Sequence, residues 1–184
     1  MTLKKSADTI PSLCLYQGHG VSRRGILLVN LGSPASTSIA DVRRYLGEFL
    51  MDPRVIDSPW LIRKIVVSAF ILPFRPKTTA RAYQRIWEPT GSPLLRLSAA
   101  LRDALAHRVA MPVELAMRYG EPGIPDALAK LLKHDVDEIL LVALYPHHAD
   151  STRTTTIEAV SGELSRLGSS VRLDVLPPFY ADPD

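Results

Sequence analysis

The sequence predicts an α/β protein with a Rossmann-like, four-stranded parallel sheet flanked by helices. Short apolar runs rich in valine, leucine and isoleucine recur along the chain, a pattern typical of strands buried on both faces. Segments with helical periodicity lie between these runs, so strands and helices alternate as in βαβ units with right-handed crossovers. The 184 residues, of which 46% are hydrophobic and 22% charged, suffice for one globular domain with a sizeable core.

The first predicted strand covers residues 25–31 and ends at Gly32-Ser33-Pro34, because glycine and proline interrupt strands. Later apolar runs predict strands at 113–117, 138–144 and 171–176. Helical periodicity predicts helices at 39–51, 98–109, 125–134 and 154–167. Ser38 and Asp41 provide a capped first turn for the first helix, and Gly168 stops the last one.

The segment 52–93 does not fit a single crossover helix, because it is long and interrupted by prolines at positions 53, 59, 73, 76, 89 and 93. We interpret it as a helical insertion after the first strand. Such an insertion lies at the carboxyl edge of the sheet, where open α/β folds bind ligands.

The formal charge of +3 and a pI near 9.1 favour anionic partners, which leaves carboxylate-bearing small molecules, acidic lipids and nucleic acid open. The single cysteine, Cys14, excludes an intrachain disulfide framework and favours a cytoplasmic location. Residues 1–23 lack the apolar core of a secretory signal, and we interpret them as an N-terminal extension. The longest apolar stretch, 60–74, is shorter than the roughly 20 residues that span a bilayer.

Six short motifs follow one another in the chain: Leu27-Leu-Val-Asn-Leu-Gly-Ser-Pro34, Phe49-Leu-Met-Asp-Pro-Arg-Val-Ile56, Tyr83-Gln-Arg-Ile-Trp87, Gly91-Ser-Pro-Leu94, Ala116-Met-Arg-Tyr-Gly120, and Leu144-Tyr-Pro146 followed by Ser151-Thr152. Each motif alone is weak, but the order of all six resembles ferrochelatases of the proteobacterial type over nearly the whole chain.

The resemblance implies that residues 24–176 form the first of two chelatase-like Rossmann domains, with 52–93 as a lip beside the porphyrin. Residues 177–184 would then begin the connection to a second domain. In this family the metal-transfer histidine and glutamate lie in that second domain, so we expect them beyond residue 184. The implied function is the porphyrin-binding, N-terminal half of an enzyme that inserts ferrous iron into protoporphyrin IX to form protohaem. We expect no turnover from this chain in isolation.

The implied substrates are ferrous iron and protoporphyrin IX, with no permanently bound cofactor and no nucleic-acid partner. The resemblance places Arg75 and Tyr83 at the porphyrin mouth, where a guanidinium can hold a propionate. A solvated arginine and a core tyrosine are the alternatives. Arg118 and Tyr119 follow a predicted strand at its carboxyl end, where this fold has its cleft. The resemblance implies that both contact the porphyrin and that Arg118 lies near the metal path, with an ordinary surface arginine as the alternative.

Leu31, Ser92, Ser151 and Thr152 complete the candidate porphyrin-binding residues. Leu31 is equally consistent with a core position, and Ser92, like Ser33, with turn chemistry. The run 151–156 is most simply the cap of the following helix.

His147 and His148 are candidate metal ligands, although adjacent residues at a strand exit point in opposite directions. The resemblance also implies that 60–74 contacts a membrane surface, peripherally and on the inner face of the plasma membrane. Arg63 and Lys64 within it would favour anionic lipid. An ordinary buried helix is the alternative.

Two other functions stay open on the residues alone. One is a flavodoxin-like module whose loop 31–37 binds a phosphate or a flavin, although no glycine-rich phosphate motif occurs there. The other is a related chelatase for a different tetrapyrrole.

Overall fold

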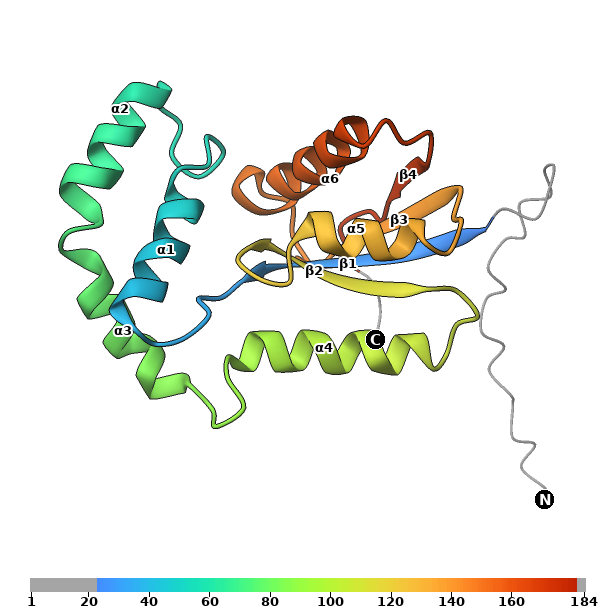
Figure 1. Ribbon diagram of the computed structural model, residues 1–184, viewed down its shortest axis with the longest axis horizontal. Coiled ribbons are helices and arrows are strands. Elements are labelled where there is room, and N and C mark those ends of the chain that lie inside the picture. The colour runs from blue at the N-terminus through green and yellow to red at the C-terminus, as the bar shows by residue number, and fades with distance from the viewer. Residues whose placement is uncertain (1–22, 182–184) are drawn as a thin grey trace, which may run out of the picture.

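A computed structural model describes residues 23–181 of the chain (Figure 1). In chain order the elements are β1 (Arg24–Gly32), α1 (Ile39–Leu50), α2 (Trp60–Ile65), the π-helix η1 (Val66–Ile71), α3 (Arg75–Ile86), α4 (Pro93–Ala106), β2 (Val113–Tyr119), α5 (Ile124–Leu132), β3 (Glu138–Ala143), the π-helix η2 (Asp150–Thr154), α6 (Thr155–Arg166) and β4 (Arg172–Val175).

Within the described residues the strands form one parallel sheet in the order β2-β1-β3-β4. Leu27 of β1 lies opposite Glu114 of β2 on one side and Leu141 of β3 on the other. The connection from β1 leads to β2 on one side, and the connection from β2 crosses to β3 on the other side of β1. This is the flavodoxin-like arrangement, with a switch point at the carboxyl end of β1. The predicted Rossmann-like parallel sheet is confirmed.

Helices cover both faces of the sheet (Figure 1). On one face Leu27, Ile139 and Leu141 pack under α5 and α6, whose contributions include Leu128 and Val160. On the other face α4 lies across β1 and β2, and its leucines pack on a second cluster of Ile26, Leu28, Val113, Leu115 and Met117. Alternate residues of β1 thus enter opposite cores, which is why its sequence is a continuous apolar run.

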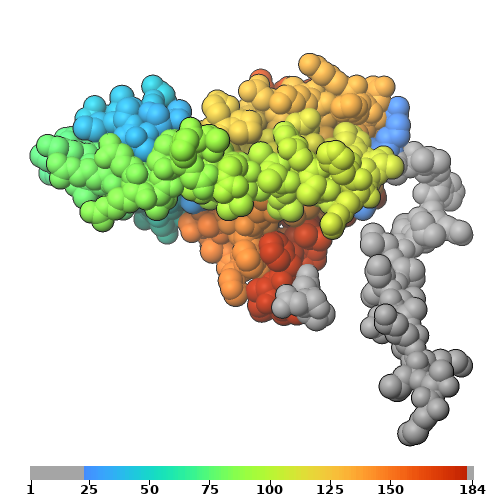
Figure 2. All heavy atoms as spheres, turned by 90° about the horizontal axis from the view of Figure 1, so that it is seen from below, coloured from blue at the N-terminus to red at the C-terminus, as the bar shows by residue number. Residues whose placement is uncertain are grey.

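The helices α1 to α3, residues 39–86, stand beside the end of the sheet and not on its faces (Figure 1). We call them the helical arm and the remaining elements the sheet unit. The arm has its own small core, in which Val42, Leu46 and Leu50 of α1 meet Val67 of η1 and Ala80 of α3. Figure 2, which looks onto α4, shows the arm continuing outward from the N-terminal end of that helix.

The arm begins before the predicted insertion 52–93, because α1 packs against α3, and it also ends earlier, at Ile86. The helix predicted at 98–109 begins earlier, at Pro93, since proline fits the first turn of a helix. The predicted cap of the first helix is confirmed, because the Ser38 hydroxyl accepts a hydrogen bond from the Asp41 amide at 3.1 Å. The predicted N-terminal extension lies outside the described residues except for Arg23.

The apolar stretch 60–74 is divided between α2 and η1. Between residues 23 and 181 no helix is both long and apolar enough to cross a bilayer.

Candidate functional site

Two pockets flank the carboxyl end of β1 and share Ser33 and Tyr45 as a common wall. The strand ends at Gly32, whose φ of +105° is a conformation that side chains disfavour. A Cβ atom at this position would lie 1.8 Å from the carbonyl oxygen of Tyr119, so only glycine lets β1 pass β2 this closely. The close crossing places the loops after both strands beside the two pockets.

The first pocket is an apolar cavity of about 510 Å³ between β1, α3 and α4. It brings together three of the predicted porphyrin-binding residues, Leu31, Tyr83 and Ser92. Most of the remaining lining is apolar and comes from Ile86, Pro93, Leu94 and Leu97. Its size and lining are those of a site for a largely apolar ligand.

Hydrogen bonds and ring contacts fix the walls of the apolar pocket. The Asn30 side chain donates to the Ser98 hydroxyl at 3.0 Å, which ties β1 to α4. On the other side the Tyr45 hydroxyl donates to the Gly32 carbonyl at 3.2 Å, and its ring meets the Tyr83 ring edge-on at 6.5 Å. Burial raises the pKa of both tyrosines, so they stay protonated near neutral pH.

Ser92 is buried and stands at the N-cap position of α4, but its hydroxyl does not cap the helix. Arg75 begins α3 and is exposed, outside the lining of both pockets. Because a helix rises about 1.5 Å per residue, Arg75 lies about 12 Å along the axis from Tyr83. The structure therefore leaves Arg75 at the far end of the helix that carries Tyr83 into the pocket.

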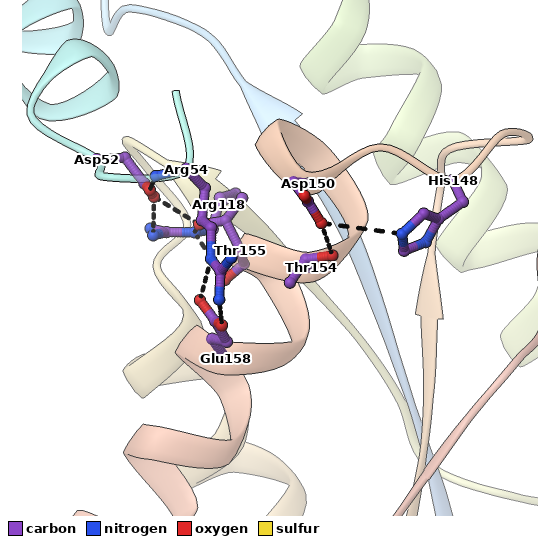
Figure 3. A network of polar contacts seen from close by, with 8 residues as sticks. All are labelled: Asp52, Arg54, Arg118, His148, Asp150, Thr154, Thr155 and Glu158. Atoms are coloured by element: carbon purple, nitrogen blue, oxygen red, sulfur yellow. Dashed lines mark hydrogen bonds and ion pairs between the residues drawn. The ribbon is translucent and has the colours of Figure 1, made fainter. Parts of the chain in front are cut away.

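Arg118 and Tyr119 do not reach the apolar pocket, and both bind Asp52 instead. Figure 3 shows Arg118 beside Asp52. Asp52 Oδ2 accepts hydrogen bonds from Arg118 Nη2 at 2.5 Å and from the Tyr119 hydroxyl at 2.9 Å. The Arg118 Nε also donates to the Thr155 hydroxyl at 2.9 Å. Arg118 is thus neither a solvated surface arginine nor a group of the apolar pocket, and a porphyrin role for it stays a prediction.

Asp52 is the centre of this network, with only 3% of its side chain exposed. It also accepts from the Thr155 hydroxyl at 2.5 Å and from the Arg54 amide at 2.7 Å. Burial raises the pKa of Asp52, but these hydrogen bonds and the Arg118 charge outweigh burial and lower it overall. The carboxylate is therefore ionised at neutral pH.

The second pocket, of about 490 Å³, is polar and lies between α1, the end of β2 and α6. Four carboxylates and two arginines line it: Asp41, Glu48, Glu121, Glu163, Arg44 and Arg118. Two of these carboxylates bind backbone amides of the loop after β2: Glu48 accepts from the Gly120 amide at 3.0 Å, and Glu121 accepts from the Gly123 amide at 2.8 Å. Between residues 23 and 181, no group of three or more His, Cys, Asp or Glu side chains is arranged to hold a metal ion.

The surroundings of loop 31–37 argue against the alternative that this loop binds a phosphate. Asp41 lies in the first turn of α1, accepts a hydrogen bond from the Ser36 hydroxyl, and pairs with Arg44. This carboxylate puts negative charge at the helix N-terminus, where a phosphate would bind.

Ser151 and Thr152 lie in η2, outside both pockets. The expected capping by residues 151–156 does not occur, because neither η2 nor α6 has a side-chain cap. The Thr155 hydroxyl instead contributes to the Asp52 network, and the Thr154 hydroxyl donates to Asp150 at 2.8 Å (Figure 3).

His147 and His148 turn to different partners. The His147 ring stacks on the Tyr180 ring at 5.1 Å, whereas His148 Nε2 lies 3.9 Å from Asp150 Oδ1. The two imidazoles do not converge on one ion site.

Sequence reasoning missed Asn30, Tyr45 and Asp52 as determinants of the site. Tyr45 falls within the helix predicted at 39–51, and Asp52 occurs only as one residue of the quoted Phe49–Ile56 motif. Nothing in the local pattern distinguishes a buried aspartate from an exposed turn residue, because the donors around it come from distant segments.

The chain matches the Ferrochelatase family model over residues 23–184. It is 48% identical over 165 residues to a ferrochelatase of Stutzerimonas stutzeri, covering 89% of this chain and 48% of that protein. It is 52% identical to ferrochelatases of Pseudomonas putida over 159 residues and of Azotobacter vinelandii over 160 residues, each match covering 86% of this chain and 47% of the relative. The chain spans about half the length of the curated relatives it matches. The apolar pocket beside the switch point of a parallel α/β sheet thus occurs in a chain that belongs to the ferrochelatase family.

Proposed function

We propose that this chain supplies one wall of the porphyrin site in an enzyme that inserts ferrous iron into protoporphyrin IX, releasing two protons and forming protohaem. The observation that carries the proposal is the apolar pocket, where Leu31, Tyr83 and Ser92 meet. Binding of a flat hydrophobic macrocycle there removes the apolar surfaces of both ligand and pocket from water, which favours binding. The Ser92 hydroxyl adds a polar group, and Arg75 lies further out on α3 for a propionate.

Removal of the two pyrrole protons requires a base. The residues that line the apolar pocket include no carboxylate and no imidazole, and the pKa values of Tyr45 and Tyr83 are raised by burial. We therefore expect the base to come from outside this pocket, and the 184-residue chain to bind porphyrin without metallating it. Loss of porphyrin fluorescence on addition of ferrous iron, followed by the absorbance of haem, would contradict this expectation.

Porphyrin binding is tested with two matched leucines of α4. Leu97 lines the pocket, whereas Leu101, one turn further along and similarly exposed, does not. Protoporphyrin IX is titrated into the wild-type chain, Leu97→Glu and Leu101→Glu, with Kd measured from porphyrin fluorescence. A buried carboxylate opposite an apolar ligand should raise Kd more than about tenfold for Leu97→Glu, and Leu101→Glu should change it by less than about twofold. Equal effects of the two substitutions would contradict the pocket assignment.

The arm also supports peripheral contact with a membrane through 60–74. Trp60, Leu61, Ile62, Ile65 and Phe70 are more than half exposed, and Phe74 is 74% exposed. Such a patch on one segment is typical of an interaction surface. The Lys64 ammonium lies 4.7 Å from the centre of the Trp60 ring, whereas the Arg63 guanidinium is buried and donates to the Ser58 carbonyl at 2.7 Å. Of the two cations, Lys64 is therefore the one that faces a lipid headgroup.

A cytoplasmic position at the inner face of the plasma membrane fits this contact. Co-sedimentation with vesicles of neutral and of anionic phospholipid provides the test. Phe70→Glu should abolish sedimentation with either vesicle, while Leu167→Glu, at an exposed leucine after α6, should leave it unchanged. Unaltered sedimentation of Phe70→Glu would exclude the arm as the contact.

A further inference from the structure

The apolar pocket is built from two parts of the molecule that face each other. The helical arm supplies Tyr45, Tyr83 and Ile86. The sheet unit supplies the end of β1 and the first turns of α4, including Leu31 and Leu97. The separation of these two walls therefore depends on how the arm is held against the sheet unit.

Polar contacts between the arm and the sheet unit differ in strength. Arg54 pairs with Glu158 of α6, but both side chains are more than 40% exposed, so this pair contributes little (Figure 3). Tyr45 and Glu48 each bond a main-chain group of the sheet unit, at Gly32 and Gly120. Asp52 differs from all of these because it brings a buried charge.

Asp52 joins three segments through one carboxylate. It lies two residues after α1, and its Oδ2 accepts from Arg118 and Tyr119 at the end of β2 and from Thr155 at the start of α6. The Arg54 amide bonds Oδ1 and orients the carboxylate plane. Charge-assisted hydrogen bonds in a buried site are strong and directional, so this contact constrains both distance and orientation.

We propose that Asp52 is a positioning residue that holds the helical arm at the separation from the sheet unit that a flat macrocycle requires. The inference rests on the proposed porphyrin site. Asp52 does not line the apolar pocket, so it acts through the placement of Tyr45, Tyr83 and Ile86.

Asp52→Asn keeps the shape of the side chain and removes its charge. With Arg118 no longer neutralised, the arm loses its fixed position, and the Kd for protoporphyrin IX should rise about tenfold, which corresponds to about 1.4 kcal/mol. Arm position is measured independently by spin-label distances between Arg81→Cys on α3 and Lys133→Cys after α5, in a background that carries Cys14→Ser. Both labelled positions are exposed. The distance distribution should broaden in Asp52→Asn.

Two neighbouring threonines provide a milder variant and its control (Figure 3). Thr155→Val removes the hydroxyl that donates to Asp52 without changing the charge. It should raise Kd only about threefold, because Arg118, Tyr119 and the Arg54 amide still bind the carboxylate. Thr154→Val removes a hydroxyl that bonds Asp150 instead, and should leave Kd and the distance distribution unchanged.

The outcomes separate this inference from the proposed function. If the wild-type chain does not bind protoporphyrin IX, the proposed function fails, and the spin-label distances alone decide whether Asp52 holds the arm. If Asp52→Asn does not fold, as judged by circular dichroism, Thr155→Val decides. A folded Asp52→Asn with an unchanged distance distribution overturns the inference, whatever its Kd. Equal effects of Thr154→Val and Thr155→Val overturn it as well.

Discussion

The sheet unit buries its large apolar side chains, whereas the helical arm exposes many of its own to solvent. In the sheet unit Leu27, Leu128 and Ile139 are completely buried between sheet and helices. In the arm Val67 is equally buried, but most of the apolar residues of α2 and η1, such as Trp60 and Phe70, face outward. The two regions are similarly apolar in sequence, so burial is not set by residue type alone. The outward apolar residues of the arm are the basis of the proposed membrane contact.

The difference has a physical origin in the layers that each region can form. A sheet covered on both faces provides two continuous cores, whereas the short helices of the arm, beside the end of the sheet, bury only one small cluster. Helices of this length are marginal in isolation, so the arm depends on its contacts with the sheet unit. The Asp52 network is one of these contacts.

A matched pair of leucine truncations gives the largest expected effect. Leu128→Ala in α5 should lower the free energy of unfolding by about 4 kcal/mol, because the packed core around it cannot collapse. Leu46→Ala in α1 should cost about 2 kcal/mol, because the small core of the arm is surrounded by partly buried residues that can relax into the space. Urea denaturation followed by circular dichroism measures both. If Leu46→Ala cost as much as Leu128→Ala, the two cores would be equally rigid.

The second-largest effect is expected from removing the charge of Asp52, which joins the arm to the sheet unit. Asp52→Asn should lower the free energy of unfolding at pH 7 by about 3 kcal/mol, since Arg118 remains partly buried without its partner. The native pKa of Asp52 is lowered, so its contribution is complete above the ordinary aspartate value of about 3.9 and is lost as the pH falls through the native pKa. The difference between wild type and variant should therefore shrink in denaturation series below about pH 4. A difference that grew on acidification would contradict this sign.

Helix capping in the arm gives a smaller effect. Ser38→Ala removes the hydroxyl that accepts from the Asp41 amide at the start of α1, and should cost about 1 kcal/mol. The midpoint of thermal unfolding measures this loss. Ser38→Asp serves as the control, because aspartate caps as well as serine and should retain the stability.

The smallest effect is expected at the outward face of the arm. Phe74→Ala should change the free energy of unfolding by less than about 0.5 kcal/mol, because this side chain is 74% exposed and alanine adds no cap to α3. Denaturation in urea, in the absence of lipid, is the measurement. A large loss of stability would mean that Phe74 packs within the protein in solution, and would remove the contrast between the two regions.

The sequence predicted most of the sheet unit because its signals are local. A continuous apolar run between turn residues indicates a buried strand, and the β1, β2 and β3 positions agree with the predicted runs within two residues at each end. The structure of the arm was harder to predict, because prolines 53, 59 and 73 excluded a single long helix without indicating how shorter helices pack. Of the candidate site residues, Leu31, Tyr83 and Ser92 meet in one pocket, while Arg75, Ser151 and Thr152 lie elsewhere.

By itself the sequence determined the α/β class, the parallel sheet and the family, because these follow from periodicity and from motifs in a fixed order. Tertiary structure alone decided that α1 joins the arm, that Arg63 points inward, and that Arg118 pairs with Asp52. The partners of a charged side chain are separated from it along the chain, by 66 residues for Asp52 and Arg118. Local composition cannot predict such a pair, because the two side chains come together only when the folded sheet positions the loops at the ends of its strands.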